Sequence, residues 1–189
     1  NEQHYEVPPA FFENALGKHL KYSSGYWPNG IDTLDDSELA MLKLSVERAE
    51  LSDGIDILEL GCGWGSLTLY MAENYPKSHI TAVSNSKDQR IFIEKKCQER
   101  GFENVKVITA DMNEFTINDK FERIVSVEMF EHMRNYEQLL DKVSSWLKPR
   151  GKLFIHIFTH KTLVYPFTED GEGDWMGRNF FSGGIMPSH

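Results

Sequence analysis

Residues 55–75, IDILELGCGWGSLTLYMAENY, combine a short apolar strand, a glycine-rich turn and the start of a helix. The run Ile55–Leu60 precedes glycines at positions 61, 63 and 65, and apolar side chains at 67, 70 and 71 then share one helical face. Glycines between a strand and a helix permit a tight turn and close approach of the backbone to a ligand, and the first helical turn offers free N–H groups. This stretch therefore predicts a ligand-binding strand–turn–helix unit.

The spacing within this turn restricts what it can bind. A dinucleotide-binding loop has the spacing GxGxxG and places a pyrophosphate on the helix N-terminus. Here the spacing is GxGxG, and Glu59 lies two residues before Gly61. A carboxylate at that position would repel a pyrophosphate but could pair with a cationic ligand. A nicotinamide oxidoreductase is thus disfavoured, also because Ser84 and Asn85 stand where an acid would end the next strand. An ordinary turn without a ligand is the alternative.

Five segments are short and apolar or β-branched, and each ends near a polar or glycine-rich turn. They are Ile55–Leu60, His79–Val83, Val105–Thr109, Ile124–Val127 and Leu153–Phe158. Helical patterns alternate with them, which indicates parallel βαβ units covered on both faces. The sequence therefore predicts an α/β fold with a doubly wound, mainly parallel sheet and helices on both faces.

Two of the helices have clear apolar faces. A helix is predicted from about Asp36 to Glu50, after a capping box at Thr33–Asp36. A second helix is predicted before the fifth strand, and the Pro and Gly of Lys148–Gly151 are expected to end it. Its apolar face would consist of Leu139, Leu140, Val143 and Leu147.

Composition and charge narrow the function further. The chain has 189 residues, the length of one domain, and 20 Lys and Arg against 29 Asp and Glu give a formal charge of −9. This acidic balance argues against nucleic-acid binding and gives no general attraction to anionic membranes. Its two cysteines have no metal-ligand spacing, so we expect no metal site and a reducing, cytoplasmic setting. The longest apolar run is far too short to cross a bilayer, so no integral membrane segment is expected.

The glycine loop and several other stretches resemble a known family. Glu59–Gly65 resembles motif I of the class I S-adenosylmethionine-dependent methyltransferases. The wider chain is similar to their cyclopropane-fatty-acid synthase-like group, which includes plant coclaurine N-methyltransferases. The similarity is carried by Gln3–Tyr5, Leu20–Ser23, Glu59–Gly65, Asn85–Gln89, Ser126–His132 and Gly183–Ser188. The resemblance implies a Rossmann-like fold with S-adenosylmethionine as the cofactor.

The resemblance also assigns residues to the methionine end of the cofactor. Glu59, Gly61 and Gly63 should hold the methionine part, its ammonium group especially. Tyr22 and Ser23 match the family's Tyr-Ser contact to the methionine carboxylate.

Other residues are assigned to the nucleoside end of the cofactor. Ser84, Asn85 and Gln89 match the family's ribose and carboxylate region, and Asp111 and Met112 follow the third strand, where the family contacts adenine. Asp111 could instead be a turn-forming or helix-capping residue.

Glu128, Glu131 and His132 follow the fourth strand at helical spacing, which predicts two carboxylates and an imidazole on one helical face. They would lie at the C-terminal edge of the sheet, where open α/β folds bind ligands. A solvated charged face is the alternative. Methyl transfer to an amine requires orientation, desolvation and removal of a proton, and this cluster suits the last task. We therefore expect these three residues to be catalytic.

The methyl acceptor is expected to be a small-molecule amine. Cyclopropane synthases, which act on an unsaturated lipid chain, usually have a small residue at the position of Glu128 and a Cys at that of Ser24, so both positions favour amine methylation over cyclopropanation. A catalytically inactive cofactor-binding module is an alternative of another class. No oligomeric state is predicted.

The chain divides into three expected parts. Residues 1–35 form an aromatic-rich arm or lid, residues 36–158 the S-adenosylmethionine-binding α/β core, and residues 159–189 the start of the acceptor-site region. Because the family's sheet has seven strands, we expect a truncated chain that lacks the last two. In the third part, the side chains that could line an acceptor pocket, or simply pack, are His160, Lys161, Tyr165 and Trp175.

Overall fold

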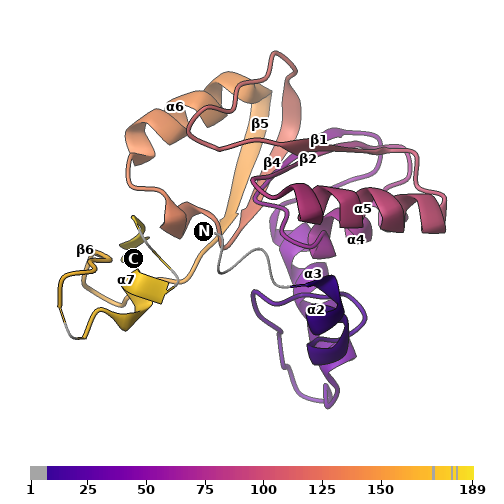
Figure 1. Ribbon diagram of the computed structural model, residues 1–189. Helices are drawn as coiled ribbons and strands as arrows, with labels where there is room; N and C mark the ends of the chain where they lie inside the picture. The colour runs from indigo at the N-terminus through magenta and orange to yellow at the C-terminus, as the bar shows by residue number, and fades with distance from the viewer. Residues whose placement is uncertain (1–7, 172, 180, 182) are drawn as a thin grey trace.

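The computed structural model describes residues 8–171, 173–179, 181 and 183–189. Within them a five-stranded sheet has the order β3-β2-β1-β4-β5, and all of its neighbouring strands are parallel. Its strands are β1 Asp56–Leu60, β2 His79–Ser84, β3 Val105–Thr109, β4 Phe121–Val127 and β5 Leu147–His156 (Figure 1). The predicted doubly wound parallel α/β fold is therefore confirmed. Gln3–Tyr5 and the first seven residues of the expected arm lie outside the described residues.

Helices cover both faces of this sheet, as the alternating pattern predicts. Figure 1 shows α6 on one side and α3, α4 and α5 on the other. The helices are α2 Pro9–Ala15, α3 Leu34–Arg48, α4 Ser66–Asn74, α5 Lys87–Arg100, α6 Tyr136–Trp146, α7 Trp175–Asn179 and the short 3-10 helix η1 Phe130–His132. A separate antiparallel pair consists of β6 Tyr165–Pro166 and β7 Ile185–Met186.

The core is built by the two faces of the central strand β1. Ile57 packs into the cluster under α3 and α4, whereas Leu58 and Leu60 pack with Trp146 of α6 on the opposite face. These three β1 side chains are fully buried. Since each such side chain contributes roughly 1.5–3 kcal/mol when it leaves water, the central strand fixes both helical layers on the sheet.

Two predicted boundaries need correction. The helix before the fifth strand ends at Trp146, so Leu147 begins β5, and Leu140 is 43% exposed. The strand can begin this early because the register between β4 and β5 shifts between Phe121 and Arg123, which accommodates the irregular stretch Pro149–Gly151 inside β5. At its other end β5 stops at His156 rather than Phe158.

The start of α3 follows from its cap. Thr33 accepts a hydrogen bond from the Asp36 backbone N–H at 3.2 Å and donates its hydroxyl to the Asp36 carboxylate at 2.6 Å. This cap satisfies one of the free N–H groups at the helix end. The helix consequently begins at Leu34 and ends at Arg48, slightly earlier at both ends than predicted.

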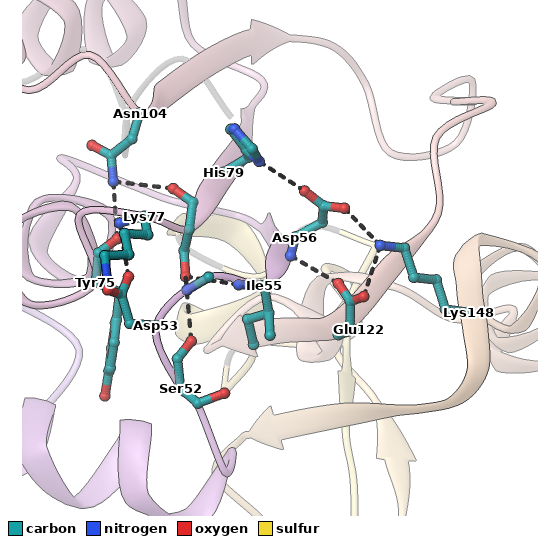
Figure 2. Close-up of polar contacts among 12 residues, drawn as sticks. Ser52, Asp53, Ile55, Asp56, Tyr75, Lys77, His79, Asn104, Glu122 and Lys148 are labelled. Atoms are coloured by element: carbon teal, nitrogen blue, oxygen red, sulfur yellow. Dashed lines mark hydrogen bonds and ion pairs between the residues drawn. The ribbon is translucent and has the colours of Figure 1, made fainter.

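An ion cluster ties the strands together at the N-terminal edge of the sheet (Figure 2). The Lys148 ammonium donates to the carboxylates of Asp56 at 2.6 Å and Glu122 at 2.7 Å, and Glu122 accepts the Asp56 backbone N–H. His79 Nδ1 lies 3.1 Å from the remaining Asp56 oxygen. The cluster thus links β1, β2, β4 and β5 at the edge opposite the glycine loop.

A second polar cluster at this edge holds the turn that leads into β2 (Figure 2). The Asn104 side-chain amide donates to the carbonyls of Tyr75 and Ser78, and the Ser78 hydroxyl accepts the backbone N–H groups of Gly54 and Ile55. The turns at this edge are therefore largely satisfied internally. None of the helices in the described part of the chain has the length and apolar character needed to cross a bilayer.

We predict that replacing Lys148 by Met destabilises the fold in a pH-dependent way. Hydrogen bonds from Lys148 hold the pKa of Asp56 below its ordinary value. Burial is the largest single effect on the pKa of Glu122 and raises it, but the hydrogen bonds to Lys148 and to the backbone, together with the Lys148 charge, lower this pKa overall. The two carboxylates raise the pKa of Lys148. Depressed carboxyl pKa values stabilise the fold above the unfolded values of 3.8 and 4.5, and this stabilisation is lost as the pH falls. Thermal unfolding should show a Tm loss of a few degrees at pH 7 that shrinks below about pH 4.

The matched control is Lys152→Met, which removes an exposed ion pair with Glu50 and should change Tm by much less. A Lys148→Met Tm loss that is equally large at pH 3 would contradict the ion-cluster account.

Candidate active site

The carboxyl ends of the first four strands open onto one cleft. Its lining residues come from the Tyr22 segment, the glycine loop and the turns after β2, β3 and β4. Eight of the ten residues predicted to bind the cofactor line it: Tyr22, Gly61, Gly63, Ser84, Asn85, Gln89, Asp111 and Met112. The other two, Ser23 and Glu59, line a small adjoining cavity that shares Tyr22, Gly61 and Gly63 with the cleft. The structure therefore brings the whole predicted set together.

The glycine loop must pass close to neighbouring side chains. Gly61 and Gly63 have φ angles of +81° and +53°, which L side chains rarely adopt. A Cβ at Gly61 would lie 2.7 Å from the Met129 Cβ, and a Cβ at Gly63 would lie 2.8 Å from the Tyr22 hydroxyl. The N–H of Gly61 donates to the Val83 carbonyl of β2, which fixes the loop on the sheet. Both glycines are thus required by backbone conformation and by space.

Glu59 is a buried acid directly beneath this loop. Its side chain is 3% exposed and accepts a hydrogen bond from the Thr68 hydroxyl at 2.5 Å. Burial raises its pKa to about 8, although Thr68 and Lys21 act in the opposite direction. Ser66 lines the same cavity, and its hydroxyl has no hydrogen-bond partner among the described residues. A buried acid in a largely apolar cavity is a favourable place for a cationic group, which would supply the missing counter-charge.

Gln89 offers an unused donor at the other end of the cleft. The Ser84 hydroxyl donates to Gln89 Oε1 at 2.6 Å, so the amide orientation is fixed. The residue is 1% exposed, and its Nε2 has no hydrogen-bond partner among the described residues. Because a buried donor without a partner costs free energy, a hydroxyl-bearing ligand in the cleft would satisfy it.

Asp111 forms a turn, which is the alternative to adenine binding considered for this residue. Its Oδ1 accepts the backbone N–H of Asn113 at 2.8 Å and the Asn113 side-chain amide at 2.9 Å. The same residue lines the cleft next to Met112. The structure thus shows a turn-forming role and leaves the carboxylate at the cleft edge.

The predicted helical face of Glu128, Glu131 and His132 is wrong. Glu128 lies between β4 and η1, outside any helix, and has a φ of +52°. Glu131 and His132 belong to the single-turn 3-10 helix η1. The reason lies in the sheet, because the Glu128 backbone N–H still donates to the His156 carbonyl of β5 at 2.8 Å before the chain turns. The three side chains nevertheless line one pocket, and Glu128 and His132 line the cofactor cleft as well.

The charges of this cluster are coupled. Glu131 is 1% exposed, and burial together with a hydrogen bond to Glu128 raises its pKa to about 8. Glu128 Oε1 lies 3.6 Å from His156 Nε2, and burial lowers the pKa of His156 against the effect of Glu128. The His132 ring stacks on Phe181 at a centroid distance of 5.1 Å. Near neutral pH one proton is therefore held within the pair of carboxyl groups.

The second pocket has an apolar wall supplied by the end of the chain. Of the four side chains named as candidates, Tyr165 lines it, whereas His160, Lys161 and Trp175 do not; the His160 ring instead accepts the N–H groups of Thr162 and Leu163. The remaining wall was not predicted: Phe158, Phe167, Met176, Phe181 and Met186. No local signal marks these residues, since their position depends on how residues 160–189 fold back.

Arg134 and Gly184 hold this terminal segment against the site. The Arg134 guanidinium donates to the Phe167 carbonyl at 3.0 Å and to the Gly184 carbonyl at 3.3 Å. A Cβ at Gly184 would lie 2.5 Å from the Glu131 carbonyl oxygen. Close contact between the terminal segment and η1 thus requires glycine at position 184. This requirement is a physical reason for a glycine in Gly183–Ser188, one of the stretches that resemble the family.

Two functional candidates were missed by the sequence reasoning. Lys21 is 6% exposed and lines the cavity beneath the glycine loop with Glu59 and Glu128. His156 ends β5 opposite Glu128. In the sequence, His156 could have been noticed because it is a polar residue that interrupts an apolar strand. Lys21 directly precedes the Tyr22–Ser23 pair, but nothing in the sequence indicates that its side chain is buried.

Comparisons with known proteins agree with the geometry. The sequence profile of the mycolic acid cyclopropane synthetase family matches residues 1–189. (S)-coclaurine N-methyltransferase of Thalictrum flavum subsp. glaucum is 44% identical over 186 residues, which cover 98% of this chain and 52% of the relative. Cyclopropane-fatty-acyl-phospholipid synthase of Escherichia coli K12 is 33% identical over 189 residues, which cover 99% of this chain and 46% of the relative.

A solved structure gives the same result. Coclaurine N-methyltransferase bound to N-methylheliamine and SAH superposes with a TM-score of 0.92 at 40% identity, over 98% of this chain and 54% of that one. The chain spans about half the length of the curated relatives it matches. These matches confirm the resemblance stated from the sequence, including both of its branches.

We predict that Gly63→Val abolishes measurable binding of S-adenosylmethionine. The new side chain would meet the Tyr22 hydroxyl and project into the space shared by the cleft and the cavity beneath it. Isothermal titration calorimetry would measure the loss. Gly54→Ala is the control, because Gly54 has a similar φ of +87° but faces open space at the other edge of the sheet. Unchanged affinity in Gly63→Val would place the cofactor elsewhere.

We also predict that Glu131→Gln stabilises the fold at alkaline pH. A carboxyl whose folded pKa is raised from 4.5 to about 8 contributes fully below the unfolded value, and that contribution is lost as the pH rises through 8. The uncharged amide does not titrate, so the Tm of the variant should exceed that of the parent at pH 9 and approach it at pH 5. The exposed Glu137→Gln should show no such crossover. A Tm deficit for Glu131→Gln that is constant with pH would show that Glu131 is charged when buried.

Proposed function

Since the chain belongs to the mycolic acid cyclopropane synthetase family, we propose that it is an S-adenosylmethionine-dependent methyltransferase that methylates a small-molecule amine. The observation that carries the proposal is the cluster of Glu128, Glu131 and His132, which opens onto two pockets at once. One pocket holds the predicted cofactor residues, and the other has an aromatic wall. A group bound in the second pocket would therefore meet the cofactor in the presence of two carboxyl groups and an imidazole.

The residues present fit the cofactor. Glu59 would hold its ammonium group, Ser23 and Tyr22 its carboxylate, and Gln89 Nε2 a ribose hydroxyl, while Asp111 and Met112 would border the adenine. When bound, S-adenosylmethionine supplies a methyl group on a sulfonium whose departure leaves a neutral thioether. The protein has little covalent work to do, so orientation and exclusion of water are its main contributions.

The protein's own chemical task is to move a proton. A secondary amine is protonated near neutral pH and must lose that proton before its lone pair can attack. The coupled carboxyls of Glu128 and Glu131, with His132 beside them, form an acceptor for this proton. Because the pKa of Glu131 lies near 8, the pair is well matched to an amine at physiological pH.

The identity of the acceptor as an amine is supported by charge and by the pocket wall. Glu128 attracts a cation, and the rings of Tyr165 and Phe167 can hold one by cation–π contact. The curated relatives of 40–44% identity are named for N-methylation of coclaurine and pavine. Cationic aromatic amines thus satisfy both features of the pocket.

Cyclopropanation of an unsaturated lipid chain is the second candidate. The apolar wall of Phe158, Met176 and Met186 suits an acyl chain as well as an aromatic amine, and the E. coli relative is a cyclopropane synthase. That reaction has no cationic acceptor for Glu128 to attract. A cofactor-binding module without activity is the remaining alternative, and turnover to S-adenosylhomocysteine would exclude it.

We further propose that residues 1–35 act as a lid over the cofactor and that the chain works in the cytoplasm. Within the arm, the ring centroids of Phe12 and Tyr22 lie 5.8 Å apart. The Phe12 ring centroid also lies 5.4 Å from that of Trp64 in the glycine loop, so the arm contacts the loop. Both cysteines are free and buried, which suits a reducing compartment.

We predict that His132→Ala and Glu131→Gln lower kcat by about 10²–10⁴ while leaving cofactor affinity nearly unchanged, because each removes part of the proton acceptor. The kcat of the parent should rise with pH up to about 8, as Glu131 loses its proton, and Glu131→Gln should flatten this rise. Glu128→Gln should mainly raise KM for a cationic amine. Initial rates with secondary aromatic amines, followed by formation of S-adenosylhomocysteine, would measure these effects.

The control for this series is Glu137→Gln, an exposed carboxylate on the first turn of α6. Loss of cofactor binding in all three site variants would assign the cluster to the cofactor side. Unchanged KM in Glu128→Gln, with activity on unsaturated phospholipid vesicles, would favour the lipid acceptor.

A further inference from the structure

Lys21 is a buried cation that the proposed reaction does not use. Its side chain is 6% exposed, and its ammonium donates to the Ser23 hydroxyl at 2.6 Å. Lysine is almost never buried to this extent without a charged partner, because the ammonium loses its hydration. Its surroundings must therefore account for its position.

Three carboxylates from three different elements act on this ammonium: Glu38 of α3, Glu59 of β1 and Glu128 after β4. Glu38 is already occupied, since it accepts the backbone N–H groups of Gly17 at 2.9 Å and His19 at 2.9 Å. Glu59 and Glu128 are the two that line the same cavity as Lys21. One belongs to the proposed cofactor site and the other to the proposed acceptor site.

Two further titratable groups, Cys62 and His156, lie near Lys21 or act on its charge. The Cys62 thiol lines the cavity beside Glu59, and burial raises its pKa well above the ordinary value, so it stays neutral. His156 lies beyond Glu128 and interacts with both Glu128 and Lys21. Lys21 is thus the cation that lines this cavity together with the two acidic groups.

We propose that Lys21 is a positioning residue that acts as the shared counter-ion of Glu59 and Glu128. The positive charge of Lys21 then repels the positive charge of a cofactor bound at the glycine loop. The inference rests on the proposed cofactor site at the glycine loop. Lys21 holds Ser23 in place and neutralises the cavity when no cationic ligand is present. A ligand cation that lies beside either carboxylate, in this cavity or in the cleft that Glu128 also lines, competes with Lys21 for it.

The protonation of Lys21 makes this competition measurable. Burial lowers its pKa to about 8, although Glu128, Glu38 and Glu59 act in the opposite direction. Its charge is therefore lost over an accessible pH range. S-adenosylmethionine carries a sulfonium that S-adenosylhomocysteine lacks, and the two ligands are otherwise alike. The ratio of their Kd values isolates the effect of that one positive charge.

The test is calorimetric measurement of both Kd values from pH 6.5 to 8.5, with no methyl acceptor present. As Lys21 loses its proton, the ratio Kd(S-adenosylhomocysteine)/Kd(S-adenosylmethionine) should rise by about 3- to 10-fold. In Lys21→Arg, whose guanidinium stays charged, the ratio should be low at pH 6.5 and should rise much less than in the parent, since only the carboxyls still titrate. In Lys21→Met it should already be high at pH 6.5 and should also rise much less, and either folded variant is sufficient. Lys18→Met, an exposed lysine three residues away, should keep the parental rise.

A flat ratio in the parent protein would overturn the proposal. A rise in Lys21→Arg or Lys21→Met as large as that of the parent would also overturn it, because the titrating group would then be a carboxyl such as Glu59 or Glu131. If neither ligand binds the parent, the proposed cofactor site itself fails and this inference fails with it. Because no turnover is measured, an inactive protein that binds both ligands would still test Lys21.

Discussion

Burial of carboxyl groups at the C-terminal edge of the sheet is the constraint on which the rest of the site depends. Glu59 and Glu131 are each nearly inaccessible to water, and burial raises the pKa of both to about 8. A buried acid must be hydrogen-bonded, neutralised or paired, since an isolated charge in the interior is very costly. Thr68 satisfies part of Glu59, Lys21 lines one cavity with Glu59 and Glu128, and Glu128 supplies a partner for Glu131. Each neighbour in the site can be understood as a response to a buried acid.

The polar groups at the N-terminal edge of the sheet stabilise the fold, whereas those at the C-terminal edge form the proposed site. At the N-terminal edge, Lys148 is bonded to both Asp56 and Glu122, so the two acids share one counter-charge and have depressed pKa values (Figure 2). At the C-terminal edge Glu59 and Glu131 have raised pKa values, and buried polar atoms of Ser66 and Gln89 have no partner among the described residues. Satisfied polar groups hold a fold together, whereas unsatisfied ones bind ligands. The parallel sheet allows both because its two ends are far apart.

The sequence predicts the parts of this structure that depend on local pattern. Four of the five strands lie within three residues of their predicted positions, since runs such as Val105–Thr109 are rich in β-branched residues between polar turns, whereas β5 begins six residues before its predicted start. The cofactor cleft is also predicted, because parallel strands bring their carboxyl-end turns together. Phe167 and Phe181 could not be predicted, as their place depends on Arg134 tethering a distant segment. Lys21 could not either, because burial of a lysine depends on three carboxylates separated widely in the chain.

The backbone at Glu128 links fold and function most directly. A φ of +52° costs a side chain about 1 kcal/mol relative to glycine, and the position cannot relax because its N–H is held by the His156 carbonyl. For stability alone, glycine would be the better residue, and the resemblance implies that cyclopropane synthases usually have a small residue there. The carboxylate must therefore be explained by what it does: it shares a proton with Glu131, lies 3.6 Å from His156 and faces both pockets. A strained residue in contact with buried Glu131 and half-buried His156, at the meeting point of the proposed cofactor and acceptor sites, is where an N-methyltransferase would most differ from a lipid-modifying relative.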